Sequence, residues 1–334
     1  MPPAPFQTFR PTRRRALTGS AIGLVVFGLL LWWLLPLGER SPSGSVTFST
    51  GARTGVYEKY GNLLKTALAR DLPGLDVSLT GSEGSWDNVE RVATGKADFT
   101  IAAADAVAKY QFQDRPGALR LRGCARLYDD YMQLVVPRDS PVKTVADLRG
   151  KRVAVGGRAS GVRLIADRVL QAAGLDLDTD IKPVGIGIDT MPRALKSGEI
   201  DAFFWSGGLP TNHVRELSKE FPVRLVELGD LVEKLHRLGE SSRYYRAAVM
   251  PADAYPAAQR GKAVSTLAVA NLLVTTDRTD PALTEAVTRT VIDSRDHIGT
   301  EVHAAQLVDL RTAVYTDPLA LHEGARRYYR SVKP

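Results

Sequence analysis

The chain repeats one order of expected strands and helices in two separate stretches, residues 45–102 and 151–205. In each stretch a strand-like run leads into a Gly-rich turn, an amphipathic helical pattern, a second strand, a short helix and a third strand. Such alternation is typical of α/β domains. The expected strands are residues 45–50, 76–80, 99–102, 151–155, 181–184 and 202–205, and the expected helices are residues 56–70, 85–93, 161–173 and 190–196. The repeated order predicts two similar α/β lobes.

The two stretches also share a Gly-x-x-Asp step before their last strand, at residues 95–98 and 198–201. A glycine in this place suits the end of a helix. We expect the chain to pass between the lobes near residues 135–137 and 247–250. The predicted division is residues 46–137 for lobe I, 138–246 for lobe II and 247–334 for a mostly helical return that packs on lobe I.

The N-terminal segment has the pattern of a membrane anchor. Residues 16–37 carry no charged side chain, and Arg13, Arg14 and Arg15 stand directly before them. About 20 apolar residues suffice to cross a bilayer, and flanking arginines favour the cytoplasmic side. The pattern predicts a cytoplasmic stretch 1–15, a transmembrane signal anchor 16–37, a linker 38–45 and a body outside the cytoplasm, held at the cell membrane. A cleaved signal peptide is the alternative.

Charge and motif content exclude several other functions. The formal net charge is +7, but residues 1–37 hold four arginines and no acid, which leaves only +3 on the remainder. A body with so small an excess of basic residues does not indicate a nucleic-acid partner. Cys124 is the only cysteine and the five histidines are scattered, so neither a disulfide, a metal nor a cofactor is expected. No motif of a hydrolase, nucleotide-binding loop or zinc protease occurs, and no enzymatic activity is predicted.

Three turns rich in Gly, Ser and Thr follow expected strands and open expected helices, at residues 50–57, 80–88 and 156–163. Ligands of open α/β sheets bind at such places, and helix N-termini attract anions. The hydroxyls of Thr54, Ser85 and Ser160 could contact a ligand or simply cap a helix. Arg53, Arg158 and Arg163 lie beside these turns and could pair with a carboxylate. The turns predict a cleft for a small anionic solute.

Several short motifs extend over residues 46–255, about two-thirds of the chain. They are Thr50-Gly51 with Gly55-Val56-Tyr57, residues 84–89, 95–99 and 147–156, Ser160-Gly161, residues 198–204, and Gly208-Leu209-Pro210. In combination they resemble the TAXI-type solute receptors of tripartite ATP-independent periplasmic (TRAP) transporters. The resemblance implies a type II periplasmic-binding-protein fold, with two lobes hinged around a central cleft. It also implies a small organic acid or amino acid, such as a glutamate-like compound, as ligand.

The resemblance carries binding roles over to Gly55, Tyr57, Ser85, Asn88, Ser160 and Gly161. The sequence departs from the family at residues 103–105, where Ala-Ala-Asp replaces Gln-Ser-Asp, and at Val162, which replaces a threonine. These departures predict a less polar or differently shaped pocket. The complete set of predicted binding residues is Thr54, Gly55, Tyr57, Ser85, Asn88, Arg158, Ser160, Gly161 and Arg163.

Together the patterns predict a solute-binding protein that captures its ligand without turnover and presents it to membrane transporter subunits. One alternative is a ligand-sensing module that reports to a membrane signalling protein. Another is an exported enzyme of the same fold, which the missing nucleophile, metal site and paired acids disfavour.

Overall fold

The computed structural model of the protein describes residues 41–53 and 55–332, and residues 42–334 form one compact unit. The predicted transmembrane segment 16–37 and Thr54 lie outside the described residues. Among the residues that are described, no helix is both long enough and apolar enough to cross a membrane.

The unit is built on one mixed sheet with the strand order β2-β1-β3-β10-β4-β7-β5-β6, while β8 pairs with β4 and β9 with β10. The bounds are β1 Gly44–Ser49, β2 Leu75–Thr80, β3 Phe99–Ala103, β4 Leu121–Pro137, β5 Arg152–Ala154, β6 Lys182–Val184, β7 Ala202–Gly207, β8 Val223–Val226, β9 Tyr245–Met250 and β10 Val264–Thr276. Each strand expected from the sequence is present, with ends that differ by one or a few residues.

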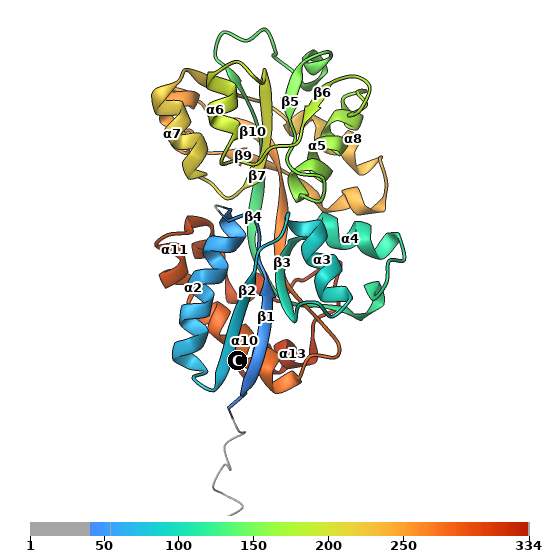
Figure 1. The fold of residues 1–334 in the computed structure, drawn as a ribbon, viewed down its shortest axis with the longest axis vertical. Coiled ribbons are helices and arrows are strands. Elements are labelled where there is room, and N and C mark those ends of the chain that lie inside the picture. Colours follow the sequence, from blue (N-terminus) through green and yellow to red (C-terminus); the bar gives the residue numbers. More distant parts are fainter. Residues whose placement is uncertain (1–40, 54, 333–334) are drawn as a thin grey trace, which may run out of the picture. The chain divides into compact units, whose positions relative to one another are not determined.

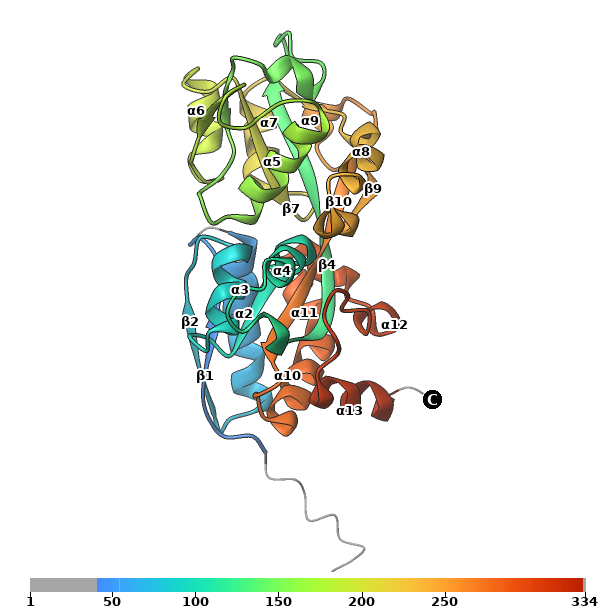
Figure 2. The ribbon, with the colours of Figure 1, turned by 90° about the vertical axis from the view of Figure 1, so that its right-hand side faces the viewer.

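Two long strands connect the two halves of this unit (Figure 1). The first half contains β1–β3 and the second contains β5–β9. β4 pairs with β10 from Leu121 to Tyr131 and then continues into the second half, where it pairs with β7 and β8. β10 pairs with β9 in the second half and with β3 in the first. The link is therefore a pair of adjacent antiparallel strands, seen side by side in Figure 2.

Neither long strand is predicted by the sequence reasoning. The expected crossings at residues 135–137 and 247–250 fall near the far end of β4 and within β9, and the division into lobes at residues 137 and 246 stays a prediction. The stretch after residue 250 was expected to be mostly helical, yet it contains the 13-residue strand β10. Its sequence is rich in Val, Thr and Leu, which fits a strand buried on both faces.

Helices cover both halves of the sheet. Those of the first half are α2 Val56–Asp71, α3 Ser85–Ala93, α4 Ala104–Phe112, α10 Pro281–Asp293, α11 Arg295–Gly299, α12 Leu310–Ala313 and α13 Glu323–Val332. Those of the second half are α5 Gly161–Ala172, α6 Met191–Lys196, α7 Asn212–Glu220, α8 Val232–His236 and α9 Pro256–Gln259. The C-terminal α10 lies against α2, where the Thr290 hydroxyl donates to Asp71 at 3.1 Å.

Each half buries its own apolar residues. In the first half Phe48 of β1 stacks on Phe99 of β3, with ring centroids 5.0 Å apart. In the second half Phe203 of β7 is fully buried in a cluster with Ile188 and Met191. A third cluster includes residues of both halves, among them Leu134 and Leu272 of the two long strands. Each half thus has a cluster of its own, and the two halves also share a continuous cluster along β4 and β10.

Candidate functional site

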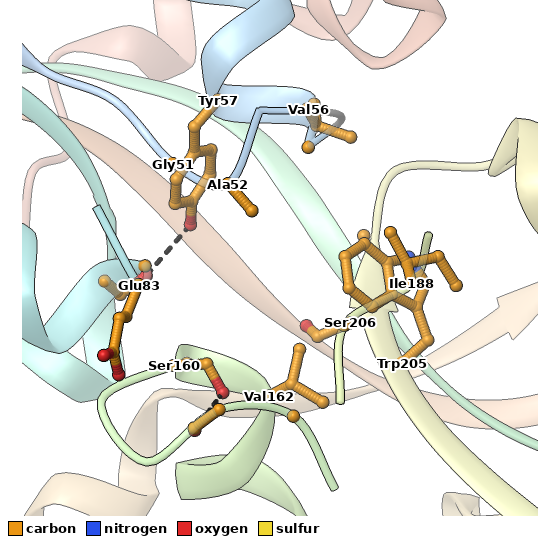
Figure 3. Close-up of a pocket in the computed structure, with 18 of the residues that line it drawn as sticks. Gly51, Ala52, Val56, Tyr57, Glu83, Ser160, Val162, Ile188, Trp205 and Ser206 are labelled. Carbon is orange, nitrogen blue, oxygen red and sulfur yellow. Dashed lines mark hydrogen bonds between the residues drawn. The ribbon is translucent and has the colours of Figure 1, made fainter. Parts of the chain in front are cut away.

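A cavity of about 350 Å³ lies between the two halves, at the ends of strands where helices begin (Figure 3). Residues of the first half that line it are Gly51, Ala52, Gly55, Val56, Tyr57, Ser82, Glu83, Gly84, Ser85, Ala103 and Asp130. Residues of the second half that line it are Gly156, Gly157, Ser160, Gly161, Val162, Ile165, Gly185, Gly187, Ile188, Asp189, Trp205, Ser206 and Gly207. The volume lies within the range of small-molecule pockets.

The two halves touch at the edge of the cavity. Oε2 of Glu83 accepts a hydrogen bond from the backbone N–H of Ala159 at 3.1 Å. Beside it, Gly84 has φ +125°, and a Cβ atom there would lie 3.3 Å from Ser160 Cα. Glycine suits this position because it adopts the positive φ without strain and has no side chain to obstruct the second half.

Three helices begin at the cavity: α2, α3 and α5, with Gly55, Gly84 and Ser160 as their N-caps. The Ser160 hydroxyl accepts from the backbone N–H of Arg163 at 3.1 Å and donates to the carbonyl of Gly157 at 2.8 Å. Both partners belong to the chain itself, so this hydroxyl acts as a helix cap, which is one of the two interpretations left open by the sequence.

The wall formed by the first half is held by a network around Tyr57. Its hydroxyl donates to Oδ1 of Asn271 on β10 and lies 3.0 Å from Oγ of Ser85. Oγ of Ser85 also accepts from the backbone N–H of Ala103 at 3.1 Å. Burial raises the pKa of the Tyr57 hydroxyl well above its usual value, so this group stays neutral and donates.

The side of the cavity formed by the second half is more apolar. Trp205 and Ile188 lie side by side across from Tyr57, and Val162 comes from the start of α5 (Figure 3). The indole N–H of Trp205 is bonded to Thr211 Oγ1 at 3.1 Å, so the ring offers the cavity an apolar surface.

Asp130 is the only buried carboxylate in the described lining. It stands on β4 close to the point where that strand passes between the halves, and its residue surface is 6% exposed. Its Oδ1 has no hydrogen-bond partner. Burial raises the pKa of this carboxyl to about 7, the carboxylates of Asp129 and Asp105 add to the effect, and the Asn271 side chain opposes it.

The described lining contains three acidic side chains, Glu83, Asp130 and Asp189, and no lysine or arginine. Arg158 and Arg163 instead line a neighbouring hollow beside Trp86 and Lys109. Arg163 there pairs with Asp178 at 3.3 Å. Over residues 41–53 and 55–332, no three His, Cys, Asp or Glu side chains are grouped to hold a metal ion.

The structure therefore brings Gly55, Tyr57, Ser85, Ser160 and Gly161 to one cavity, as expected from the sequence.

Asn88, Arg158 and Arg163 are not part of this lining. Asn88 is fully buried, where its amide donates to the Ile101 carbonyl at 3.0 Å and accepts from the Ser49 hydroxyl at 2.7 Å. It ties α3 to β1 and β3. The lining residues that sequence reasoning missed include Asp130, Ile188 and Trp205.

Comparisons with known proteins agree with this architecture. Residues 48–332 match the model of the NMT1-like family. The structure is similar to a Listeria monocytogenes protein assigned to an L-cystine ABC transporter, with 14% identity over 79% of this chain and 98% of that one and a TM-score of 0.50. It is similar to a Xanthomonas citri protein bound to ATP, with 13% identity over 87% and 100% of the two chains and a TM-score of 0.50.

A further similar structure is SsuA of Escherichia coli, a periplasmic aliphatic sulphonate binding protein, with 16% identity over 88% and 84% of the chains and a TM-score of 0.47. The Listeria and Xanthomonas structures share the present fold over most of their lengths. The expected α/β architecture is confirmed.

Proposed function

The chain belongs to the NMT1-like family, and on that basis we propose that it is an extracytoplasmic solute-binding protein. It captures a small solute between its two halves and presents the solute for transport across the membrane, without chemical turnover. The observation that carries this proposal is a cavity lined from both halves, which are joined by the adjacent strands β4 and β10.

This arrangement suits hinged closure. Two strands can bend at one point while the clusters around Phe48 in the first half and Phe203 in the second keep their packing. A ligand that contacts both walls favours the closed form, because its differential contacts shift the equilibrium toward that form. The Glu83–Ala159 contact already joins the halves at the cavity edge.

The proposed location and partners rest on the N-terminal pattern and on the resemblance. Residues 16–37 would anchor the protein in the cell membrane with the body outside the cytoplasm. Membrane subunits of a TRAP-type transporter, which the TAXI resemblance implies, receive the closed form. Resistance of the full chain to alkaline extraction from membranes supports the anchor, and release into the soluble fraction contradicts it.

Solute capture is testable on the full chain in mild detergent. The melting temperature is measured with a panel of amino acids, carboxylates, dicarboxylates and primary amines, and a trisaccharide too large for about 350 Å³ serves as negative control. A ligand at about 100 times its Kd adds about 2.7 kcal/mol of stability. We expect one class of compound to raise the melting temperature in a concentration-dependent way. That compound should be recovered unchanged after incubation with the protein. No rise with any compound contradicts the proposal.

A further inference from the structure

The charge distribution around Asp130 indicates what kind of solute the cavity accepts, given the proposed function. Asp130 is more than nine-tenths buried and lines the cavity, and no lysine or arginine shares that lining. A buried carboxylate without a paired cation is costly, so its place in the cavity lining points to a positive charge supplied by a ligand.

The surroundings of Asp130 supply no counter-charge. Asp129 is its neighbour on β4, but successive strand side chains point to opposite faces, and the Asp129 carboxylate is already paired with Arg126 and Arg246.

Asp105, whose charge also acts on Asp130, accepts a hydrogen bond from the Tyr245 hydroxyl at 2.6 Å, and Arg168 donates to the same hydroxyl. Tyr57 of the cavity lining and Asn271, to which the Tyr57 hydroxyl donates, are neutral. The arginines close to Asp129 and Asp105 are therefore occupied elsewhere.

We propose that the cavity takes a solute with a protonated nitrogen on a small apolar body, and that Asp130 is the counter-ion of that nitrogen. The apolar body packs against Val162, Ile188 and Trp205, which line the cavity. A plain carboxylate meets three acids and no base, so it is disfavoured.

Two kinds of solute carry such a nitrogen, simple amines and amino acids, and they differ by a carboxylate. A simple amine uses Asp130 alone. An amino acid adds a carboxylate, which the N-termini of α2, α3 or α5 can accept through their backbone N–H groups. Both share the chemistry recognised by Asp130.

The test is calorimetric titration of the full chain in detergent with matched compounds on one body: 2-phenylethylamine, phenylalanine, 2-phenylethanol and phenylacetate, and the corresponding isobutyl series. We expect the amine or the amino acid of a series to bind at least tenfold more tightly than its alcohol or acid. Asp130→Asn should lower that affinity at least tenfold, since it removes the charge and keeps the shape. Asp76→Asn, the same change on an exposed face of β2, should leave it unchanged.

A second readout on the wild-type protein does not depend on how the variant folds. A cation beside Asp130 lowers the pKa of that carboxyl, so binding at pH 7 should release protons, measured by repeating the titration in buffers of different ionisation enthalpy. Three results would overturn the inference and leave solute capture standing. They are tightest binding of the acid in a series, uptake of protons on binding, and an affinity of Asp130→Asn equal to that of the wild type. No binding by any compound of either series, or of the wider panel, contradicts both.

Discussion

Oε2 of Glu83 lies 3.1 Å from the backbone nitrogen of Ala159 and accepts its hydrogen bond, which ties the turn before α3 in the first half to the turn before α5 in the second. The adjacent Gly84 and Ser160 pack closely at the same edge. The site predicted to bind a solute is therefore also the place where the two halves meet.

Removal of this contact should favour an open form. Glu83→Ala deletes one hydrogen bond, so the ratio of closed to open protein should fall by roughly 2- to 12-fold. Small-angle scattering without ligand should give a larger radius of gyration for this variant than for the wild type. Glu233→Ala, at an exposed position on α8, is the matched control. Identical scattering profiles for all three proteins would show that the contact does not hold the halves together.

The Tyr57 hydroxyl should stabilise the folded protein as well as shape the cavity. Tyr57→Phe leaves Oδ1 of the fully buried Asn271 without its donor. The loss of a buried hydrogen-bond partner costs about 1–3 kcal/mol of unfolding free energy, measurable by urea titration. The same substitution at Tyr315, whose side chain is 66% exposed, should have no measurable effect. Equal losses in the two variants would contradict the role given to this network.

Asp130 should make the stability depend on pH in a defined direction. Its folded-state pKa of about 7 exceeds the value of about 4 for an unfolded aspartate, so the folded protein binds more protons between these values. The contribution of Asp130 to the unfolding free energy is complete below pH 4. It is lost as the pH rises to 7, by at most about 1.4 kcal/mol per pH unit.

Asp130→Asn removes this contribution, whereas the raised pKa of Asp105 acts in both proteins. The difference in unfolding free energy, wild type minus variant, should therefore fall from pH 4 to 7 and level off outside that range. If the unfolding free energies of the wild type and Asp130→Asn change with pH in parallel over this range, Asp130 is not a buried proton-binding group.

A second polar contact joins the two halves outside the cavity lining. The Tyr245 hydroxyl donates to Asp105 at 2.6 Å and accepts from Arg168 at 3.1 Å, and all three residues are buried. Arg168→Leu leaves the Asp105 carboxylate without the nearby positive charge and should cost about 3–5 kcal/mol in urea unfolding. Adding Asp105→Asn should recover part of that loss. A double variant less stable than Arg168→Leu alone would argue against charge compensation.

Sequence periodicity was sufficient to locate most of the short strands and helices of the two halves, because their Gly-rich turns and apolar faces are local signals. It could not identify β4 and β10. Their burial in the middle of the sheet removes the alternation of apolar and polar residues that marks a half-exposed strand. The division into lobes at residues 137 and 246 stays a prediction.

The site shows a similar limit. Glycine-rich turns before helices indicated Gly55, Ser85, Ser160 and Gly161, and all four line the cavity, because such turns are local features of the sequence. Their binding roles stay predictions. Arg158 and Arg163 are adjacent to the third turn in sequence, yet they line a neighbouring hollow. Asp130 belongs to the unrecognised β4, so its burial in the cavity depends on long-range strand pairing that no local pattern reveals.

Solute capture in the cavity is tested most directly by filling the space. Ala52 is exposed and its side chain points into the cavity (Figure 3), so Ala52→Trp should occupy the binding space without disturbing a core. Ala257→Trp, at an exposed residue of α9, is the control. In calorimetric titration, the compound of the panel that binds the wild type should bind Ala257→Trp equally and lose measurable affinity for Ala52→Trp. Unchanged binding by Ala52→Trp would place the solute elsewhere and contradict capture between the two halves.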